Sequence, residues 1–354
     1  MRRRFLFAAA GIVFLAFTAC NRRGATPDPS TGQGRFVIGI LQLVDSPTSE
    51  EVRKGIFRAL EESGLRDGVD IEVRIRNGRG DVAAVQRLAH ELASTADLIV
   101  TISTPCLQAA LMTESTVPIV FTAVAHPALV VGDFNENGGP GRVTGVASTG
   151  PIRASLAFIR EILPGAARIG TLWTPAEINS EYYLDLTRRA AAEWGVEIVA
   201  VPVASGRDVM YAATLMINDG VDAVYQISDN TVNAAFEVLG RAAEENALPL
   251  FGGFLKSVEM GACAAMGFDF VDMGYRTGLI AARIKAGENP GRIPIHTMDD
   301  VRIHINIAAA AKQSVVFPPS VLERADRIVG AEATAPLFSQ GSSRLFGKSG
   351  GEFK

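Results

Sequence analysis

The sequence contains few cysteines, no long basic run and no long apolar segment. Three cysteines in 354 residues cannot supply the dense disulfide framework of a small secreted domain. Lysine and arginine number 34 against 38 acidic residues, and the longest basic run is Arg2 to Arg4. The chain therefore lacks the electrostatic signature of a nucleic-acid-binding protein. Because 48% of the residues are hydrophobic, a disordered or collagen-like chain is excluded as well.

Signals of catalysis and of metal binding are also missing. The four histidines, His90, His126, His296 and His304, are scattered along the chain and do not have the spacing of a metal site. Residues 347–351 match the pattern G-x-S-x-G, but they lie in a polar tail without the strand and helix that such a nucleophile requires. The sequence therefore predicts no enzyme activity, no metal and no cofactor.

The amino terminus is typical of an export signal. Three arginines precede an apolar stretch from Phe5 to Phe17, and small residues stand directly before Cys20. This stretch is shorter than the roughly 20 residues of a membrane-spanning helix. The end of the stretch resembles a bacterial lipobox, so we expect removal of residues 1–19 and lipidation of Cys20; a cleaved signal with an incidental cysteine is the alternative. Residues 20–34 are rich in Pro, Gly, Ser and Thr and predict a flexible tether. We expect the protein to be exported and to be attached to a membrane only through this lipid.

From residue 36 onward, short apolar runs alternate with longer amphipathic stretches, which is typical of βαβ units around a parallel sheet. We predict an α/β protein with two doubly wound parallel-sheet lobes. Residues 36–150 form the first lobe, and residues 151–268 with 298–329 form the second. A helix over 269–288 returns to the first lobe, and residues 331–354 form a disordered tail.

Local patterns add detail to this outline. A helix is predicted over 49–64 with Ser49 as its cap, and a single helix over 230–246. Cys106 and Cys263 are far apart in the sequence and stand in apolar surroundings, so we expect buried free thiols rather than a disulfide.

Ligands of open α/β sheets bind outside the carboxyl ends of the strands. The predicted binding site is therefore the cleft between the lobes. In the first lobe, Ser103 and Thr104 precede a proline at a predicted helix start, where free amide groups suit a ligand carboxylate. Thr122 and Ala123 end the next strand and offer a hydroxyl and backbone groups beside it. Plain helix capping explains the Ser and Thr residues equally well.

The second lobe offers short polar residues at two further helix starts. Asn179 and Ser180 open one helix, and Asp229, Asn230 and Thr231 open another. Asp229 is the candidate partner of a ligand ammonium, because an α-amino acid needs both of its charges paired once they are desolvated. Asp is also a favoured helix cap, and this alternative stays open.

An apolar ligand side chain would need aromatic partners. Trp173, Phe254 and Phe268 are candidates, with Phe254 preferred because it follows two glycines in a loop. Aromatic residues belong to the core more often than to a site. Asp269, at the start of the helix after Phe268, is a further cap that can face the cleft.

Several local phrases follow one another in a specific order: IGILQLVDSP, STP, PIVFTAVAHP, VTGVAS, VDAVYQISDNTV, GFDFVDMGYRTG and ERADRIV. Together they resemble the ABC-transporter substrate-binding lipoprotein family that includes tryptophan and tyrosine importers, over residues 36–329. The resemblance implies the periplasmic binding protein fold, a small-molecule ligand, and a permease with its ATPase as partners. The family usually has Asp before Pro after the fourth strand, whereas this chain has His126 before Pro127.

Three classes of function remain. The preferred class is an exported lipoprotein that closes two lobes around a small ligand, an aromatic or other apolar L-amino acid, and delivers it to an ABC importer. A sensor module that presents its closed form to a signalling partner has the same fold. An exported α/β enzyme requires a nucleophile, base or metal constellation, and the sequence does not contain one.

Cys20→Ser tests the lipid anchor. Without the thiol that carries the lipid, the exported protein should be recovered in the soluble fraction or remain unprocessed. The measurement is membrane fractionation with acyl labelling. Recovery of the variant in the membrane fraction with unchanged labelling contradicts the lipobox interpretation.

Overall fold

The computed structural model describes residues 34–132 and 141–330, and all elements lie in the unit that begins at Arg35. The predicted signal peptide, Cys20, the tether up to residue 33 and the tail over 331–354 lie outside the described residues. Among the described residues, no helix is long and apolar enough to cross a membrane.

The first sheet is entirely parallel and has the strand order β11-β5-β4-β3-β1-β2. Its strands are short β-branched runs, and most of their residues are buried, as expected when helices cover both faces. Their bounds are β1 Phe36–Gln42, β2 Ile71–Asn77, β3 Leu98–Ile102, β4 Ile119–Val124, β5 Val143–Ala147 and β11 His296–Thr297. The helices of this lobe are α1 Pro47–Glu62, α2 Val82–Thr95, α3 Thr104–Leu111, α4 Ala128–Val131 and α10 Phe270–Lys285, with a 3₁₀ turn η3 Pro290–Arg292.

The second sheet has the order β13-β12-β10-β9-β8-β6-β7, and only the β10–β12 pair is antiparallel. Its strands are β6 Arg168–Trp173, β7 Glu197–Pro202, β8 Ala223–Gln226, β9 Leu250–Gly252, β10 Ala264–Gly267, β12 Arg302–Asn306 and β13 Arg327–Val329. Its helices are α5 Ile152–Ile162, α6 Ile178–Ala192, α7 Val209–Asn218, α8 Asn230–Ala234, α9 Phe236–Glu245, α11 Ile307–Lys312 and α12 Pro319–Glu323, with 3₁₀ turns η1 Gly206–Asp208 and η2 Leu255–Met260. The prediction of an α/β protein with two parallel-sheet lobes is confirmed.

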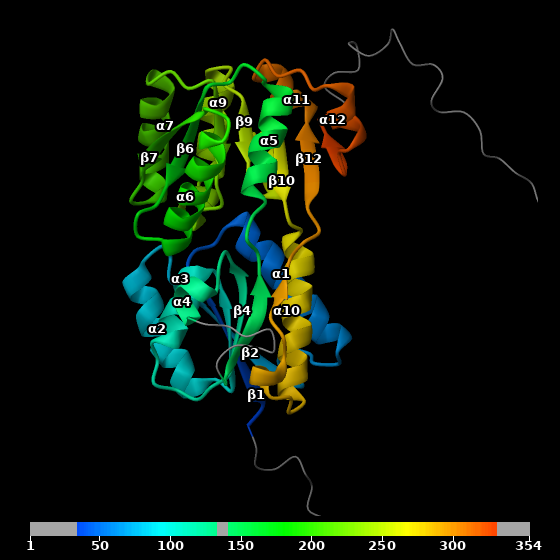
Figure 1. The fold of residues 1–354 in the computed structure, drawn as a ribbon. Helices are drawn as coiled ribbons and strands as arrows, with labels where there is room; N and C mark the ends of the chain where they lie inside the picture. The colour runs from blue at the N-terminus through cyan, green and yellow to red at the C-terminus, as the bar shows by residue number, and fades with distance from the viewer. Residues whose placement is uncertain (1–33, 133–140, 331–354) are drawn as a thin grey trace, which may run out of the picture. The chain divides into compact units, whose positions relative to one another are not determined.

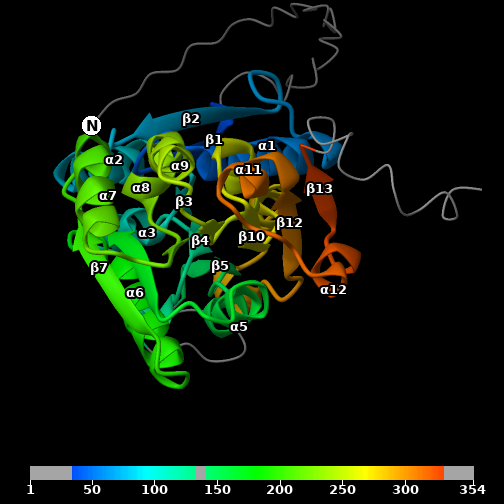
Figure 2. The same ribbon diagram turned by 90° about the horizontal axis from the view of Figure 1, so that it is seen from above.

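Helices cover both faces of each sheet. In the first lobe, α1 and α10 lie on one face and α2 and α3 on the other. The α2 and α3 layer has its own apolar cluster, whereas the α1 and α10 layer belongs to a cluster that continues into the second lobe. In the second lobe, α7 and α9 cover one face and α5 and α6 the other (Figure 2). The chain passes between the lobes three times, after β5, after β10 and after β11. These crossings make a hinge of three segments (Figure 1).

Two local predictions need correction. Ser49 does not cap the first helix: α1 begins at Pro47, and Ser46 is its cap, with Ser49 completing a reciprocal capping box. The predicted helix over 230–246 is two helices, because the backbone leaves helical geometry at Ala235. The expectation of buried free thiols is confirmed for Cys106 and Cys263.

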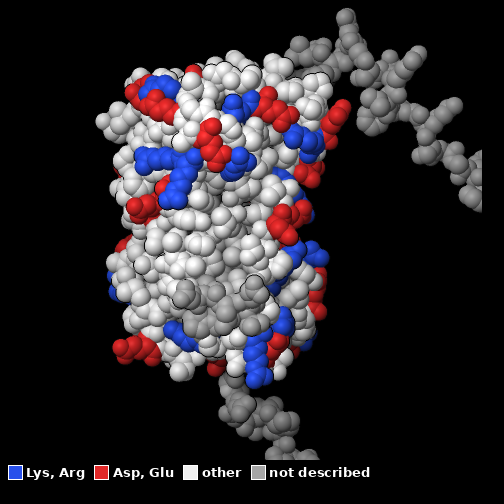
Figure 3. Space-filling model, viewed as in Figure 1, with Lys and Arg blue, Asp and Glu red and all other residues white. Residues whose placement is uncertain are grey.

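Charged residues are mixed over the surface. On the face shown in Figure 3, Lys and Arg side chains stand beside Asp and Glu on both lobes. Most of the ion pairs have one or both partners well exposed, for example Arg58 with Glu62 and Arg189 with Asp185. Such pairs contribute little to stability, so apolar packing is the main source of stability in both lobes.

Helices α1 and α10 pack so closely that only glycine fits at their contact (Figure 1). A Cβ atom at Gly55 of α1 would lie 2.0 Å from the Val271 carbonyl oxygen of α10. A Cβ atom at Gly274 of α10 would lie 2.0 Å from the Val52 carbonyl oxygen of α1. Backbone atoms on both sides of the contact leave no flexible side chain that could move aside. This contact fixes α1, and with it the start of α1, relative to the hinge segment that leads into α10.

Gly274→Ala tests this contact. The added methyl group must push two backbones apart, so the free energy of unfolding should fall by about 1–3 kcal/mol or more. Gly165→Ala is the matched control, because nothing lies within 4 Å of the Cβ position there. Urea unfolding of both variants is the measurement. Equal stability of the two variants would show that α1 and α10 can separate without cost.

Candidate functional site

A cavity lies between the lobes, and most of the residues that line it follow the ends of strands. It has about 40 Å³ of room for the centre of a water molecule, and about 720 Å³ of open space in all when the solvent at its mouth is counted. Most of the lining residues are polar but uncharged, aromatic or small, and none of them carries a formal charge. They are Gln42, Leu43, Val44, Ser46, Thr48, Ser49, Ile102, Ala123, Ala125, Ser148, Gly150, Pro151, Asn179, Tyr183, Ser228, Asn230, Asn233, Gly253, Phe268 and Phe270.

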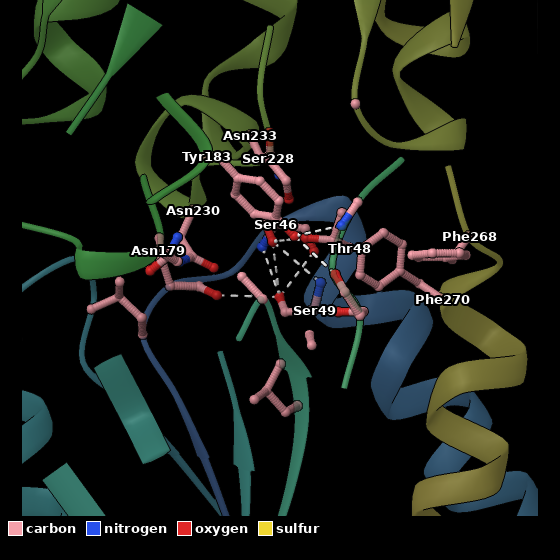
Figure 4. A pocket seen from close by; sticks show the side chains of 18 of the residues that line it. Ser46, Thr48, Ser49, Asn179, Tyr183, Ser228, Asn230, Asn233, Phe268 and Phe270 are labelled. Atoms are coloured by element: carbon pink, nitrogen blue, oxygen red, sulfur yellow. Dashed lines mark hydrogen bonds between the residues drawn. The ribbon is translucent and has the colours of Figure 1, made fainter. Parts of the chain in front are cut away.

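The start of α1 forms one wall of this cavity (Figure 4). Ser46 Oγ accepts a hydrogen bond from the backbone N–H of Ser49 at 3.2 Å, and Ser49 Oγ accepts one from the backbone N–H of Ser46 at 2.9 Å. The hydroxyl of Thr48 lies 2.9 Å from Ser46 Oγ. The first turn of a helix has amide groups without intrahelical partners, and the helix dipole is positive there. Because α1 has 16 residues, this wall suits an anionic group.

Two phenylalanines form another wall. Phe268 and Phe270 stand on either side of the α10 cap, and both are largely buried. In the view of Figure 4 they lie on the side of the cavity opposite Asn179 and Asn230, with the start of α1 between the two groups. The cavity therefore has an apolar aromatic side and a polar amide side.

Behind the amide side, two buried carboxylates, Asp229 at the cap of α8 and Glu177 before α6, accept hydrogen bonds from the start of α8. Glu177 stands at the cap position of α6 but does not cap that helix. Its carboxylate accepts hydrogen bonds from the backbone N–H groups of Asn230 at 3.2 Å and Thr231 at 3.1 Å. Asp229 accepts from the backbone N–H of Val232 at 2.8 Å. The two acids together satisfy the first three amide groups of α8, where the helix dipole favours negative charge.

The role predicted for Asp229 needs correction. Asp229 is fully buried, is not part of the cavity wall, and has both carboxylate oxygens occupied by protein donors. Besides the Val232 amide, it accepts from the Thr174 amide at 2.9 Å, the Thr174 hydroxyl at 3.0 Å and the Ser180 hydroxyl at 2.6 Å. The capping alternative therefore describes Asp229, which also joins the loop before α6 to α8. Burial, and after it the nearby charge of Glu177, raises the pKa of Asp229 to about 7.

Of the four candidates in the first lobe, one lines the cavity and three do not. Ala123 lines it and holds a positive φ of 54°, a strained conformation for a residue other than glycine. Ser103, Thr104 and Thr122 are buried but lie outside the cavity wall. The helix start that faces the cavity is that of α1 rather than that of α3.

The other second-lobe candidates divide in the same way. Asn179 and Asn230 line the cavity. Ser180 and Thr231 do not, because their hydroxyls donate to the buried carboxylates of Asp229 at 2.6 Å and Glu177 at 2.8 Å.

Two further candidates, Phe254 and Asp269, also lie outside the cavity wall, whereas the candidate Phe268 lines it. Phe254 is fully buried and packs edge-on against Phe236 with ring centroids 5.2 Å apart, so it is a core residue. Asp269 caps α10 and forms an ion pair with Arg302 at 3.0 Å.

Sequence reasoning missed most of the α1 wall and part of the aromatic wall. Gln42, Ser46 and Thr48 line the cavity together with Phe270, and none of them was a predicted site residue. A signal was present, since Ser46 and Pro47 come shortly after the first strand, and a serine followed closely by a proline also stands at the start of α3. The same logic applied to both helix starts would have included α1.

Direct contacts between the lobes close the cavity at its sides. The hydroxyl of Tyr183 on α6 donates to the Ser148 carbonyl at 2.8 Å and accepts from the Gly150 amide at 3.1 Å in the first crossing segment. Burial raises the pKa of Tyr183. The ring of His126, after β4, stacks on the ring of Tyr182 with centroids 5.2 Å apart and planes 7° from parallel. The histidine that departs from the family pattern thus contacts the opposite lobe.

Nothing in the described part of the chain gathers three or more metal-ligating side chains. Cys106 and Cys263 are fully buried, and burial raises the pKa of both thiols to about 12, so neither is a reactive thiolate. The chemistry that this site offers is hydrogen bonding, apolar contact and a helix dipole, which suits reversible binding.

The raised pKa of Asp229 predicts a pH dependence of stability. Between its ordinary value of 3.8 and about 7, the folded protein holds a proton that the unfolded chain has released. The free energy of unfolding should therefore fall as pH rises through this window, by up to a few kcal/mol for this group. Asp229→Asn should remove that part of the fall. The measurement is urea unfolding of both proteins at several pH values between about 4 and about 8.

The wild-type curve contains a second contribution, because burial also raises the pKa of Glu51 to about 7. The difference between variant and wild type cancels that contribution. Asp229→Asn also loses acceptors at the start of α8, so the variant should be less stable throughout. A difference that stays constant across the window contradicts the raised pKa.

Comparison with known proteins agrees with this geometry. Residues 37–329 match the family described as ABC transporter substrate binding protein. A tyrosine-binding protein of Clostridioides difficile (strain R20291) is 32% identical over 272 residues, which are 76% of this chain and 78% of that protein. A solved ABC domain from Streptococcus pneumonia in complex with L-Trp is 26% identical with a TM-score of 0.78, over 84% of this chain and 100% of that chain. A ligand-free, open structure of a substrate-binding protein from Clostridium difficile is 29% identical with a TM-score of 0.60, over 82% and 98%. These relatives are binding proteins and not enzymes, and the chain belongs to the family of ABC transporter substrate-binding proteins.

Proposed function

We propose that this protein binds an L-amino acid with an aromatic or other apolar side chain and delivers it to an ABC importer. The observation that carries the proposal is the composition of the cavity wall. A helix start, a set of amide groups and two aromatic rings surround one space. These three surfaces match the carboxylate, the ammonium and the apolar side chain of such a ligand.

The carboxylate is assigned to the start of α1. Ser46, Thr48 and Ser49 are each less than one-tenth exposed and provide hydroxyls. Pro47 has no N–H, and the Ser49 N–H already donates to Ser46 Oγ, so the backbone donor that this turn offers a ligand is the Thr48 N–H. The helix dipole stabilises an anion at this end. Among the described residues, no acidic side chain lines the cavity, so no carboxylate in this wall repels that of a ligand.

The apolar side chain is assigned to the wall that contains Phe268 and Phe270. An aromatic ligand ring gains both apolar burial and edge or stacking contacts with these rings. The names of the relatives support the same class of ligand, since one is a tyrosine-binding protein and another was solved with L-Trp.

Lobe closure around the ligand is the proposed mechanism. At similar sequence identity, the TM-score is 0.78 with the L-Trp complex and 0.60 with the structure named open. The stacked pair His126 and Tyr182 and the hydrogen bonds of Tyr183 hold the lobes in the present arrangement. We infer that this arrangement is the closed one.

Delivery requires partners and a location. We propose that the protein acts outside the cytoplasm, attached to a membrane by a lipid on Cys20, and presents its closed form to a permease and its ATPase. The support is the family membership together with the signal layout of residues 1–19. Membership of an ABC-transporter family favours this role over a sensor module.

A ligand panel tests the proposal. L-tryptophan and L-tyrosine should raise the Tm, because a ligand at about 100 times its Kd stabilises the folded state by about 2.7 kcal/mol. The methyl ester of the same amino acid, which lacks the carboxylate, should bind far more weakly. Thermal unfolding followed by titration calorimetry is the measurement. If no L-amino acid binds, or if the ester binds as tightly as the acid, the assignment to amino acids fails.

A further inference from the structure

Glu177 is a buried acid that does not touch the cavity, although it contacts the residues that form its wall. Only 1% of its surface is exposed. Its carboxylate accepts from the side-chain Nδ2 of Asn179 at 3.2 Å and from the side-chain Nδ2 of Asn230 at 2.5 Å, both on the same oxygen. Asn179 and Asn230 line the cavity. Glu177 therefore lies directly behind the amide side of the site.

These hydrogen bonds fix the orientation of the two amides. A carboxylate can only accept, so each Asn must direct its NH₂ group toward Glu177. Turning either amide over would place its oxygen against the Glu177 oxygen. The carbonyl oxygen is thus directed away from Glu177 in both residues. For Asn179, that oxygen is buried and has no hydrogen-bond partner among the described residues.

A second acceptor in the wall is also without a partner. Asn233, three residues after Asn230 on α8, lines the cavity and is 2% exposed. Its Oδ1 has no hydrogen-bond partner within the described part of the chain. A buried acceptor without a donor is costly. A ligand that brings N–H donors to this side of the cavity can supply a partner to both oxygens, Asn179 Oδ1 and Asn233 Oδ1, and so remove the cost at each.

We propose that Glu177 is a positioning residue for a ligand ammonium: it holds the cavity-wall amides with their oxygens toward the ligand and supplies negative charge one hydrogen bond behind them. The inference rests on the proposed function and names the part of the site that receives the amino group. The ammonium is bound by the neutral oxygens of Asn179 and Asn233. The compensating charge remains buried in the second lobe.

This arrangement explains how an ammonium can bind to a wall whose described residues include no acidic side chain. An amide oxygen whose NH₂ group donates to a carboxylate is a stronger acceptor, because hydrogen bonds in a chain polarise one another. The attraction between Glu177 and the ammonium acts through protein rather than water, where screening is weaker. The same charge disfavours a ligand carboxylate on this side, which sets the orientation of the zwitterion.

A role limited to capping α8 is the alternative, and the experiment must separate the two. Glu177→Gln keeps the size of the side chain but removes the charge and the fixed amide orientation. Glu181→Gln, on the exposed surface of the same helix, is the matched control. The probes are L-tryptophan and indolepropionate, which is the same molecule without its amino group. Titration calorimetry at a pH of about 8, above the pKa of about 7 of Asp229, keeps that group in one state.

We expect Glu177→Gln to weaken L-tryptophan binding by about tenfold or more, while the affinity for indolepropionate stays the same or rises. Glu181→Gln should change neither affinity. Asn179→Leu removes the unpartnered oxygen and leaves Glu177 and its contacts with α8 in place, so it should show the same selective loss. This second variant serves if Glu177→Gln does not fold.

The opposite outcomes are equally clear. An equal loss for both probes shows that the variants damage the fold of the wall, and the positioning role is then wrong. Unchanged L-tryptophan binding in Asn179→Leu overturns the inference while the proposed function stands. If the wild type binds no L-amino acid, the proposed function fails, and the inference fails with it.

Discussion

Parallel strands that end at one edge of a sheet are the constraint on which this structure depends. Each lobe has its strand ends at the cavity, and most of the wall is built from the residues that follow β1, β4, β5, β6, β8, β9 and β10. At such an edge a chain that turns into a helix exposes amide N–H groups and short polar side chains. Two such edges facing each other give a site whose walls are set by topology and whose chemistry is set by a few residues at each turn. The short β11 and the antiparallel β12 do not disturb this arrangement. They lie at or next to an edge of their sheets, where the chain crosses back from the first lobe to the second.

This constraint explains what the sequence could predict. The alternation of apolar runs and amphipathic stretches was sufficient for the two-lobed α/β fold, and the strand ends pointed to Ala123, Asn179 and Asn230, which line the cavity. The sequence pattern was not sufficient to decide which helix start, that of α1 or that of α3, faces the cavity. Ser46 with Pro47 and Ser103 with a following proline are the same local pattern. Only the close packing of α1 on α10, which joins segments more than 200 residues apart, places the first pattern at the cavity.

Asp229 shows a second limit of sequence reasoning. A carboxylate at a helix start suits a ligand ammonium and suits the helix itself, and the local sequence is identical in both cases. The distinction depends on how many protein donors surround the carboxylate. Thr174 and Ser180 come from a different loop and helix start, 55 and 49 residues away. Glu177 was not a candidate at all, because its contacts with Asn230 and Thr231 exist only once α6 and α8 are side by side.

The two lobes therefore contribute opposite electrostatic halves of the site. The first lobe presents the positive end of α1, and the second lobe presents amide oxygens with the negative charge of Glu177 behind them. A ligand with a single charge can satisfy only one of these halves and leaves the other desolvated without a partner when the lobes meet. A zwitterion satisfies both, and its two charges are joined by covalent bonds, so it connects the lobes across the cavity. With the proposed ligand, the free energy that holds the lobes together would include the interaction with both charges, and closure itself would then be selective for α-amino acids.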